Sequence, residues 1–196
     1  MKDVATFLAE VSESRRRDQT AARAGFVASP DLCLPRALDV ALDHRWLISP
    51  VRGCSEYALR SARVGVPCRD REQIEYWFAY YPDANWMLQT GEESGVLALE
   101  VDPKLSRYSL AYLAGEDRSW QRSLQFAVHG RWQILFAYAA GLRSLVGRYT
   151  GLRLHAGDQI FVPPLRTLNG IKIEYANPHA PLLPVPDWLY QAMRGK

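Results

Sequence analysis

Residues 85–102 read NWMLQTGEESGVLALEVD. Two largely apolar runs, residues 86–89 and 96–103, stand on either side of a turn that holds two glycines. Short apolar runs bounded by turn residues are typical of buried β-strands. The stretch therefore predicts two buried strands around a glycine turn, with Glu100 and Asp102 at the end of the second strand.

Helical and strand patterns alternate on both sides of this stretch. Before it, apolar residues recur at helical spacing from Ala37 to Leu42, an apolar run at residues 46–48 is ended by Pro50, and Asp70 can cap a further helix. After it we expect a short helix at residues 109–113, strands at 125–128, 133–138, 152–155, 159–162 and 171–175, and a terminal helical segment at 188–190. This alternation predicts a mixed α/β domain whose later strands are short and antiparallel.

The composition permits a substantial core and gives only a mild basic charge. The chain has 196 residues, of which 48% are hydrophobic, and its formal net charge is +3. That charge is too small to indicate a nucleic-acid-binding protein by itself. Lysine accounts for only 4 of the 24 basic residues, so 24 − 4 = 20 are arginine. The planar guanidinium fork suits phosphate and carboxylate oxygens, although a coding bias explains the same excess.

Cysteine usage and hydropathy together predict a cytoplasmic protein without a membrane segment. The three cysteines are an odd number without the close pairing that a zinc site requires, so we expect reduced thiols. The N-terminus carries charges and no apolar stretch that resembles a signal peptide. Residues 1–35 are expected to form an N-terminal helix and linker, and residues 36–196 the domain proper.

The acidic pair is the first candidate for chemistry. Residues two apart on a strand point to the same face, so the Glu100 and Asp102 carboxylates are predicted to lie together. Paired carboxylates are a natural seat for Mg²⁺ or Mn²⁺ and supply part of the ligand set for phosphoryl transfer. Two acids at the solvent end of a strand are weak evidence without further context.

Around this pair, short motifs follow one another in a specific order. They are Tyr81-Pro82-Asp83-Ala84-Asn85, Thr90-Gly91, Ser94-Gly95, Glu100-Val101-Asp102, Gly130-Arg131-Trp132-Gln133-Ile134-Leu135-Phe136 and Phe161-Val162-Pro163-Pro164. The order resembles the N-terminal domain of bifunctional DNA primase-polymerases, a family of the archaeo-eukaryotic primase superfamily. The resemblance runs from Ala37 to Tyr175, and the joint order is more specific than any single motif.

The resemblance implies an α+β primase-polymerase-like fold: an RRM-like antiparallel sheet with flanking helices and a small N-terminal helix and strand unit. It also implies nucleotide or DNA as the ligand, in DNA replication or a mobile-element context. Carried over by position, it makes Glu100 and Asp102 the catalytic and metal-binding acids, with Mg²⁺ or Mn²⁺ as cofactor. Trp132 is the tryptophan expected beside the ligand face. The nucleotide-binding candidates are His129, Arg131, Gln133, Arg153 and His155.

Departures from the family pattern fall on positions that matter for catalysis. Glu100 stands where the family usually has aspartate, and Gln133 matches a histidine that contacts nucleotide phosphate. Glutamine donates a hydrogen bond but carries no charge or proton. A third family acid is expected on residues 152–155, which read LRLH and hold no carboxylate. Two-metal phosphoryl transfer without one ligand is severely weakened.

Three functions remain open from the sequence. The first is a degenerate primase-polymerase domain that binds nucleotide or nucleic acid with little or no synthesis. The second is an active template-directed nucleotidyltransferase in which Asp158, or an acid from a partner, completes the site. The third is an inert module that attaches to a replication protein.

Overall fold

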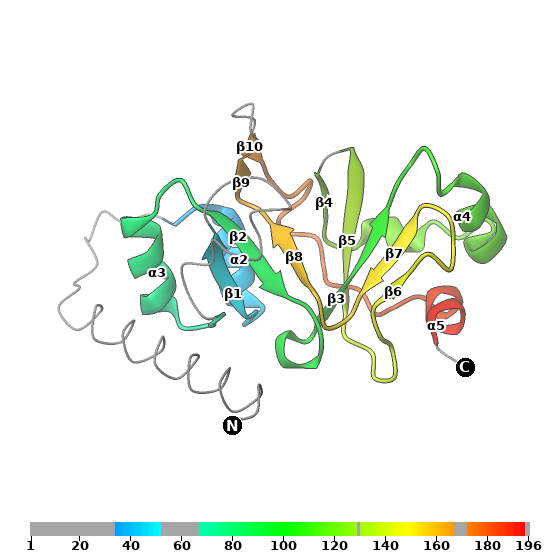
Figure 1. The fold of residues 1–196 in the computed structure, drawn as a ribbon, viewed down its shortest axis with the longest axis horizontal. Coiled ribbons are helices and arrows are strands. Elements are labelled where there is room, and N and C mark those ends of the chain that lie inside the picture. Colours follow the sequence, from blue (N-terminus) through cyan, green and yellow to red (C-terminus); the bar gives the residue numbers. More distant parts are fainter. Residues whose placement is uncertain (1–33, 52–66, 129, 167–171, 195–196) are drawn as a thin grey trace, which may run out of the picture.

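The computed structural model describes residues 34–51, 67–128, 130–166 and 172–194 (Figure 1). The helix and linker expected within residues 1–35 lie almost wholly outside these ranges, as does His129. Within the described ranges the chain forms helices and antiparallel sheets, which is the predicted α+β class. No helix in these ranges is long and apolar enough to cross a membrane.

The first sheet has three antiparallel strands in the order β1-β2-β8. Helices α2 and α3 lie beside it (Figure 1). Asp70 caps α3 as predicted, because its carboxylate accepts a 2.8 Å hydrogen bond from the Gln73 N–H. The bounds are α2 Arg36–Asp43, β1 Ile48–Val51, α3 Arg71–Tyr80, β2 Asn85–Gln89 and β8 Gln159–Val162.

The second sheet has five antiparallel strands in the order β4-β5-β3-β7-β6. Helices α4 and α5 lie beside this sheet (Figure 1). The bounds are β3 Val96–Val101, α4 Arg107–Ala114, β4 Gln125–Val128, β5 Arg131–Ala137, β6 Leu145–Val146, β7 Leu152–His155 and α5 Asp187–Met193. Two short 3₁₀ helices are η2 Glu92–Ser94 and η3 Ser119–Arg122. A small ladder joins β9 Leu165–Arg166 to β10 Lys172–Ile173, so the strand expected at residues 171–175 is shorter than predicted.

The two strands of the 85–102 stretch exist as predicted, but they do not pair with each other. Strand β2 belongs to the first sheet and β3 to the second. The turn between them contains η2, with Gly91 and Gly95 at φ 114° and 63°. Such positive φ values favour glycine, and here they turn the chain from one sheet into the other.

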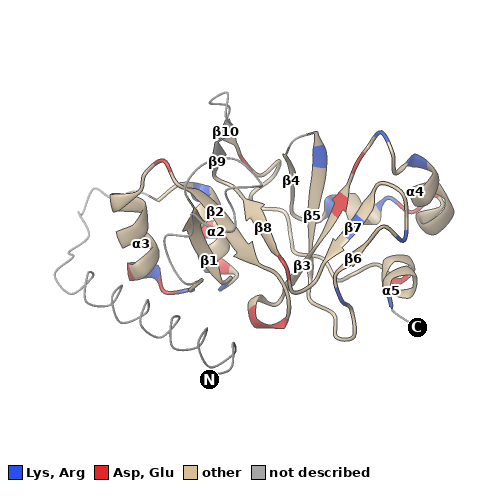
Figure 2. Cartoon of the chain, viewed as in Figure 1, with Lys and Arg blue, Asp and Glu red and all other residues tan. Residues whose placement is uncertain are grey.

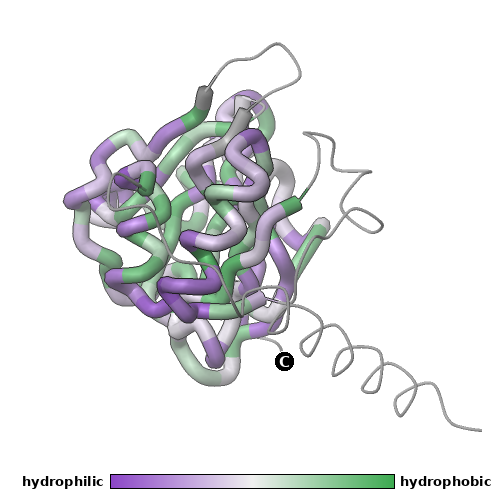
Figure 3. Tube along the Cα trace, turned by 90° about the vertical axis from the view of Figure 1, so that its left-hand side faces the viewer, coloured by the Kyte–Doolittle hydropathy of each residue, from purple (hydrophilic) through white to green (hydrophobic). Residues whose placement is uncertain are grey.

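Strand β3 stands between two apolar cores. Val96 and Ala98 pack into a core with the first sheet, whereas Leu97 and Leu99 pack into a core with α5 and η3. Hydrophobic segments run through the interior between polar surface segments (Figure 3). Because successive side chains of a strand point to opposite faces, one strand serves both cores.

Pro50 was expected to end the preceding apolar run. Instead it lies inside β1, which continues to Val51. It lies opposite Trp86 of β2, and β1 is an outer strand of its sheet. Ile48 exchanges backbone hydrogen bonds with Cys68, so its N–H and C=O groups point away from β2. Because these directions alternate along a strand, the backbone groups of Pro50 also point away from β2. Pro50 therefore removes no hydrogen bond from the β1–β2 ladder.

Candidate functional site

Glu100 sits in the middle of the five-stranded sheet, with one polar neighbour on each adjacent strand. Gln133 on β5 and Arg153 on β7 lie directly opposite it. Opposed residues of antiparallel strands share a face, so these three side chains project from the same side. The Glu100 side chain is only 14% exposed, and the Gln133 Nε2 donates to its Oε2 over 2.9 Å.

Arg131 connects the two acids that the sequence singled out. Its Nη1 lies 2.8 Å from Glu100 Oε1, and its Nε lies 3.7 Å from Asp102 Oδ2. Acidic and basic segments accordingly lie side by side on β3 and β5 (Figure 2). The predicted pairing of Glu100 and Asp102 on one face is therefore present, with an arginine of the chain itself as their shared cation.

The other oxygen of Asp102 serves the backbone. Its Oδ1 accepts hydrogen bonds from the N–H groups of Lys104 and Leu105, over 2.9 and 3.2 Å. Aspartate commonly caps a turn in this way. Asp102 thus fixes the connection from β3 to α4 and balances part of the charge of Arg131.

The surroundings hold Glu100 in its charged form. Its pKa falls from the ordinary value of 4.5 to about 2. The His155 ring, the Gln133 amide and the guanidinium groups of Arg153 and Arg131 favour the carboxylate, whereas burial opposes them. Glu100 is therefore a charged carboxylate at neutral pH.

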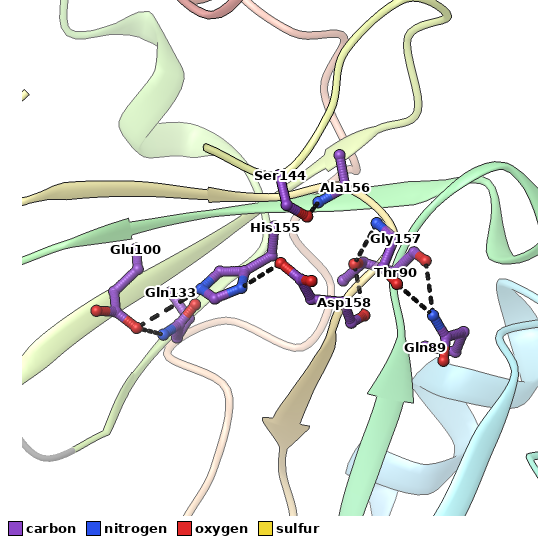
Figure 4. A network of polar contacts seen from close by, with 9 residues as sticks. All are labelled: Gln89, Thr90, Glu100, Gln133, Ser144, His155, Ala156, Gly157 and Asp158. Atoms are coloured by element: carbon purple, nitrogen blue, oxygen red, sulfur yellow. Dashed lines mark hydrogen bonds and ion pairs between the residues drawn. The ribbon is translucent and has the colours of Figure 1, made fainter. Parts of the chain in front are cut away.

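His155 separates Glu100 from Asp158 (Figure 4). The ring Nε2 lies 3.7 Å from Glu100 Oε2, which is an ion-pair distance and longer than a hydrogen bond, and Nδ1 lies 3.3 Å from Asp158 Oδ2. The His155 side chain is only 11% exposed. Asp158 therefore contacts the far side of the imidazole, and the ring stands between it and Glu100.

The turn that carries Asp158 is tied to the end of β2. The Thr90 backbone N–H and hydroxyl both donate to the Asp158 carbonyl, over 2.8 and 2.7 Å, and the Thr90 hydroxyl accepts from the Gly157 N–H. Gln89 adds a 2.8 Å hydrogen bond to the Gly157 carbonyl. These contacts give the Thr90-Gly91 motif a structural role, because they join the two sheets close to His155 (Figure 4).

The donor set does not fit a two-cation centre. Both oxygens of Glu100 and both oxygens of Asp102 already face a hydrogen-bond donor or a guanidinium group of the chain. Within the described ranges, no three histidine, cysteine, aspartate or glutamate side chains gather closely enough to hold a metal ion. Two-metal phosphoryl transfer needs several free oxygen ligands, and this arrangement does not supply them.

The formal charges of this cluster cancel. Glu100 and Asp102 contribute two negative charges, and Arg131 and Arg153 contribute two positive charges. These four residues line a pocket of about 320 Å³ together with residues 149–152. An anion that enters this pocket meets two carboxylates as well as two guanidinium groups.

The structure brings most of the predicted site residues together, but not all of them. Arg131, Gln133, Arg153 and His155 all gather around Glu100. Trp132 does not. It lies opposite Val101 and therefore projects from the other face of the sheet, so the expectation that it stands beside the ligand face was wrong. The roles of these residues toward a nucleotide stay predictions.

Sequence reasoning missed that Arg131 pairs with the acids. The signal was present, because Arg131 is two residues before Gln133 on the same strand and so shares its face. What the sequence does not give is the register that places this face against β3. With the register known, the ion pair follows from alternation.

Comparison with known proteins gives one family. The model described as bifunctional DNA primase/polymerase, N-terminal, matches residues 37–188, which is most of the chain. No curated protein sequence matches the chain. The matched range includes both sheets and all residues of the cluster around Glu100.

Proposed function

The chain belongs to the bifunctional DNA primase/polymerase N-terminal family, and from this premise we propose that it is a catalytically degenerate member. In this proposal the domain binds nucleotide or nucleic acid in a replication or mobile-element context and does not extend a primer. The domain itself is primase/polymerase-like, as its family match indicates. Loss of chemistry and retention of binding are the two parts of the proposal, and each has its own test.

The Arg131 guanidinium between Glu100 and Asp102 is the observation that carries the loss of chemistry. A divalent cation at the acid pair would have to displace a 2.8 Å ion pair and the 2.9 Å hydrogen bond from Gln133. Correctly placed cations supply much of the stabilisation of a phosphoryl-transfer transition state. A side chain that occupies their place supports a site that no longer performs this reaction.

The active alternative receives little support from the geometry. It requires Asp158 or a partner's acid to complete the ligand set. Asp158 lies against His155 Nδ1 at 3.3 Å, with the imidazole between it and Glu100. A rotation of Asp158 alone would not remove that ring.

Primer synthesis and extension assays test the loss of chemistry. The natural chain and a Glu100→Ala, Asp102→Ala double variant are each incubated with template, labelled nucleotides and Mg²⁺ or Mn²⁺. We expect no product above the level of the double variant. Robust synthesis that disappears in the double variant would overturn the degenerate assignment.

Binding of a labelled single-stranded DNA oligonucleotide tests the retained function. Fluorescence anisotropy in excess EDTA and in millimolar Mn²⁺ is expected to give the same affinity, because no metal ion takes part. Affinity is also expected to fall as salt rises, since arginine contacts to phosphate release counterions. If no oligonucleotide binds in either condition, the interaction-module alternative replaces the proposal.

A further inference from the structure

A second pocket lies on the face of the sheet opposite to Glu100. Its volume is about 700 Å³, and it is bounded by α4, by the segment around η3 and by strands β3, β4 and β5. Ligand sites of small molecules commonly have volumes of about 300 to 1,000 Å³ and combine apolar walls with a few polar groups. This pocket has both properties and shares no lining residue with the Glu100 pocket.

Trp132 provides an accessible aromatic wall. It is 40% exposed, whereas Trp120, which also lines the pocket, is only 4% exposed. The Trp120 indole N–H is already satisfied, because it donates to the Asp117 carbonyl over 3.0 Å. An exposed indole face at a pocket is a platform on which a planar ring can stack.

The charge of this pocket is positive, in contrast to the neutral cluster around Glu100. Its lining includes Arg107 and Arg118 and no carboxylate. Arg107 begins α4 and is exposed. Arg118 Nη1 donates to the carbonyls of Gly115 and Asp117, over 2.8 and 2.9 Å, which holds its guanidinium in place. Guanidinium groups suit phosphate oxygens, so an anion is expected to bind in this pocket in preference to the pocket that contains Glu100 and Asp102.

Two glutamines complete the lining. Gln125 Nε2 donates to the Gln121 carbonyl over 2.5 Å, which orients the Gln125 amide and leaves its oxygen available. Gln121 is exposed and also lines the pocket. Amide groups beside an aromatic wall can hydrogen-bond the edge of a nitrogen heterocycle.

We propose that this pocket, between α4 and the β4–β5 edge, binds a nucleoside phosphate. The base stacks on Trp132 with its edge toward Gln121 and Gln125, and the phosphate faces Arg107 and Arg118. The inference rests on the proposed function in that nucleotide binding is retained, and it moves that binding to the opposite face of the sheet. No metal ion is required, because the arginines supply the positive charge.

Isothermal titration calorimetry of the full chain in EDTA tests the ligand class. Adenosine diphosphate is the probe, with adenosine and pyrophosphate as separate arms. We expect one site per chain for adenosine diphosphate and at least tenfold weaker binding of each fragment, because stacking and charge act together. Equal affinity for pyrophosphate would indicate a plain anion site and overturn the assignment, as would absence of binding. The proposed function would still stand if the oligonucleotide bound.

Variants locate the site. Trp132→Ala and Arg107→Glu are each expected to weaken adenosine diphosphate binding at least tenfold. The matched control is Arg143→Glu, which reverses an exposed arginine outside the lining and should leave the affinity unchanged. Retained binding in both pocket variants together with loss in Arg153→Glu would place the ligand on the acid-pair face and refute the inference.

A spectroscopic readout covers the case in which Trp132→Ala does not fold. Of the other five tryptophans, Trp46, Trp77, Trp86 and Trp120 are each at most 4% exposed, and the half-buried Trp188 does not line the pocket, so ligand stacking should quench mainly Trp132. Adenosine diphosphate is expected to quench the fluorescence of the natural chain. Trp132→Phe, which keeps an aromatic wall, should retain most of the affinity and lose most of the quenching. Undiminished quenching in that variant would contradict stacking on Trp132.

Discussion

Arg131 determines how the two acids behave. Its guanidinium contacts Glu100 at 2.8 Å and Asp102 at 3.7 Å, and both acid side chains are mostly buried. Removing the arginine leaves two mostly buried carboxylates without their cation, and such uncompensated charges destabilise a folded chain. Two neighbouring carboxylates without their arginine would therefore need another cation or a proton.

This need gives a first prediction, on a change of Arg131 to methionine. Arg131→Met keeps much of the side-chain volume and removes the charge, so we expect the acid pair to bind one Mn²⁺ per chain, at least tenfold more tightly than the natural chain does. Electron paramagnetic resonance of free Mn²⁺ measures the affinity. Arg143→Met is the matched control, because Arg143 is exposed and does not line the pocket of the acid pair. Binding that persists after Glu100→Gln is added would refute the prediction.

The lowered pKa of Glu100 gives a second prediction, on acid stability. Its pKa is about 2 in the folded chain in place of 4.5, so its carboxylate contributes stability above pH 4.5 that is lost as the pH falls toward 2. At about 1.4 kcal/mol for each pKa unit, this contribution is roughly 3.5 kcal/mol at most, and solvent screening around the 40% exposed Arg131 reduces it. Urea unfolding should therefore show a stability gap between the natural chain and Glu100→Gln that narrows from pH 5 to pH 3. Glu116→Gln shows what the loss of an exposed carboxylate alone does, and a gap that stays constant for Glu100→Gln would contradict the assignment.

At the scale of elements, the start of β7 is packed tightly against the chain that leaves β3. Gly151 has φ +76°, and its carbonyl accepts a 2.8 Å hydrogen bond from the Asp102 N–H. A Cβ at Gly151 would lie 2.7 Å from the carbonyl carbon of Leu105. The three atoms nearest to this Cβ are all backbone atoms of Leu105 and Ser106, so no flexible side chain can give way.

A third prediction compares Gly151 with Gly147. Both have positive φ, at 76° and 81°, but a Cβ at Gly147 would meet nothing within 4 Å. Gly147→Ala should cost about 1 to 2 kcal/mol from backbone strain alone. Gly151→Ala should cost at least about 2 kcal/mol more, because the clash with backbone adds to the strain. Chemical denaturation measures both, and equal losses would show that the segment after β3 can move aside.

At the scale of the whole molecule, β3 makes the two cores mutually dependent. Its alternate residues enter different cores, so neither core can be lost without removing the strand that supports the other. Two cores that share a strand are therefore expected to unfold in one cooperative transition.

The fourth prediction concerns this cooperativity. Leu88 belongs to the first core and Leu154 to the second, and both are fully buried. Replacement of either by alanine should cost about 2 to 5 kcal/mol and move a single calorimetric transition to lower temperature. Two peaks, of which each variant moves only one, would mean that the cores unfold separately.

Much of this architecture could be read from local pattern. The α3 cap at Asp70, the strands around residues 125–138 and the acid pair followed from propensity and alternation. The separation of β2 from β3 into two sheets did not, because strand pairing depends on contacts that are distant in the sequence. The Arg131 ion pair required the register of β5 against β3. The face of Trp132 did not, because Trp132 is the neighbour of Gln133 on the strand and alternation places it on the opposite face.

Pro50 has a consequence for how copies of this protein meet in solution. The outer edge of a sheet is a template on which a strand from another molecule can add, which is a route to aggregation. Along β1, Ile48 has already committed its outward backbone groups to Cys68, and Pro50 has no N–H to offer. An incoming strand would find no continuous ladder at this edge, so the proline protects the domain against edge-to-edge self-association.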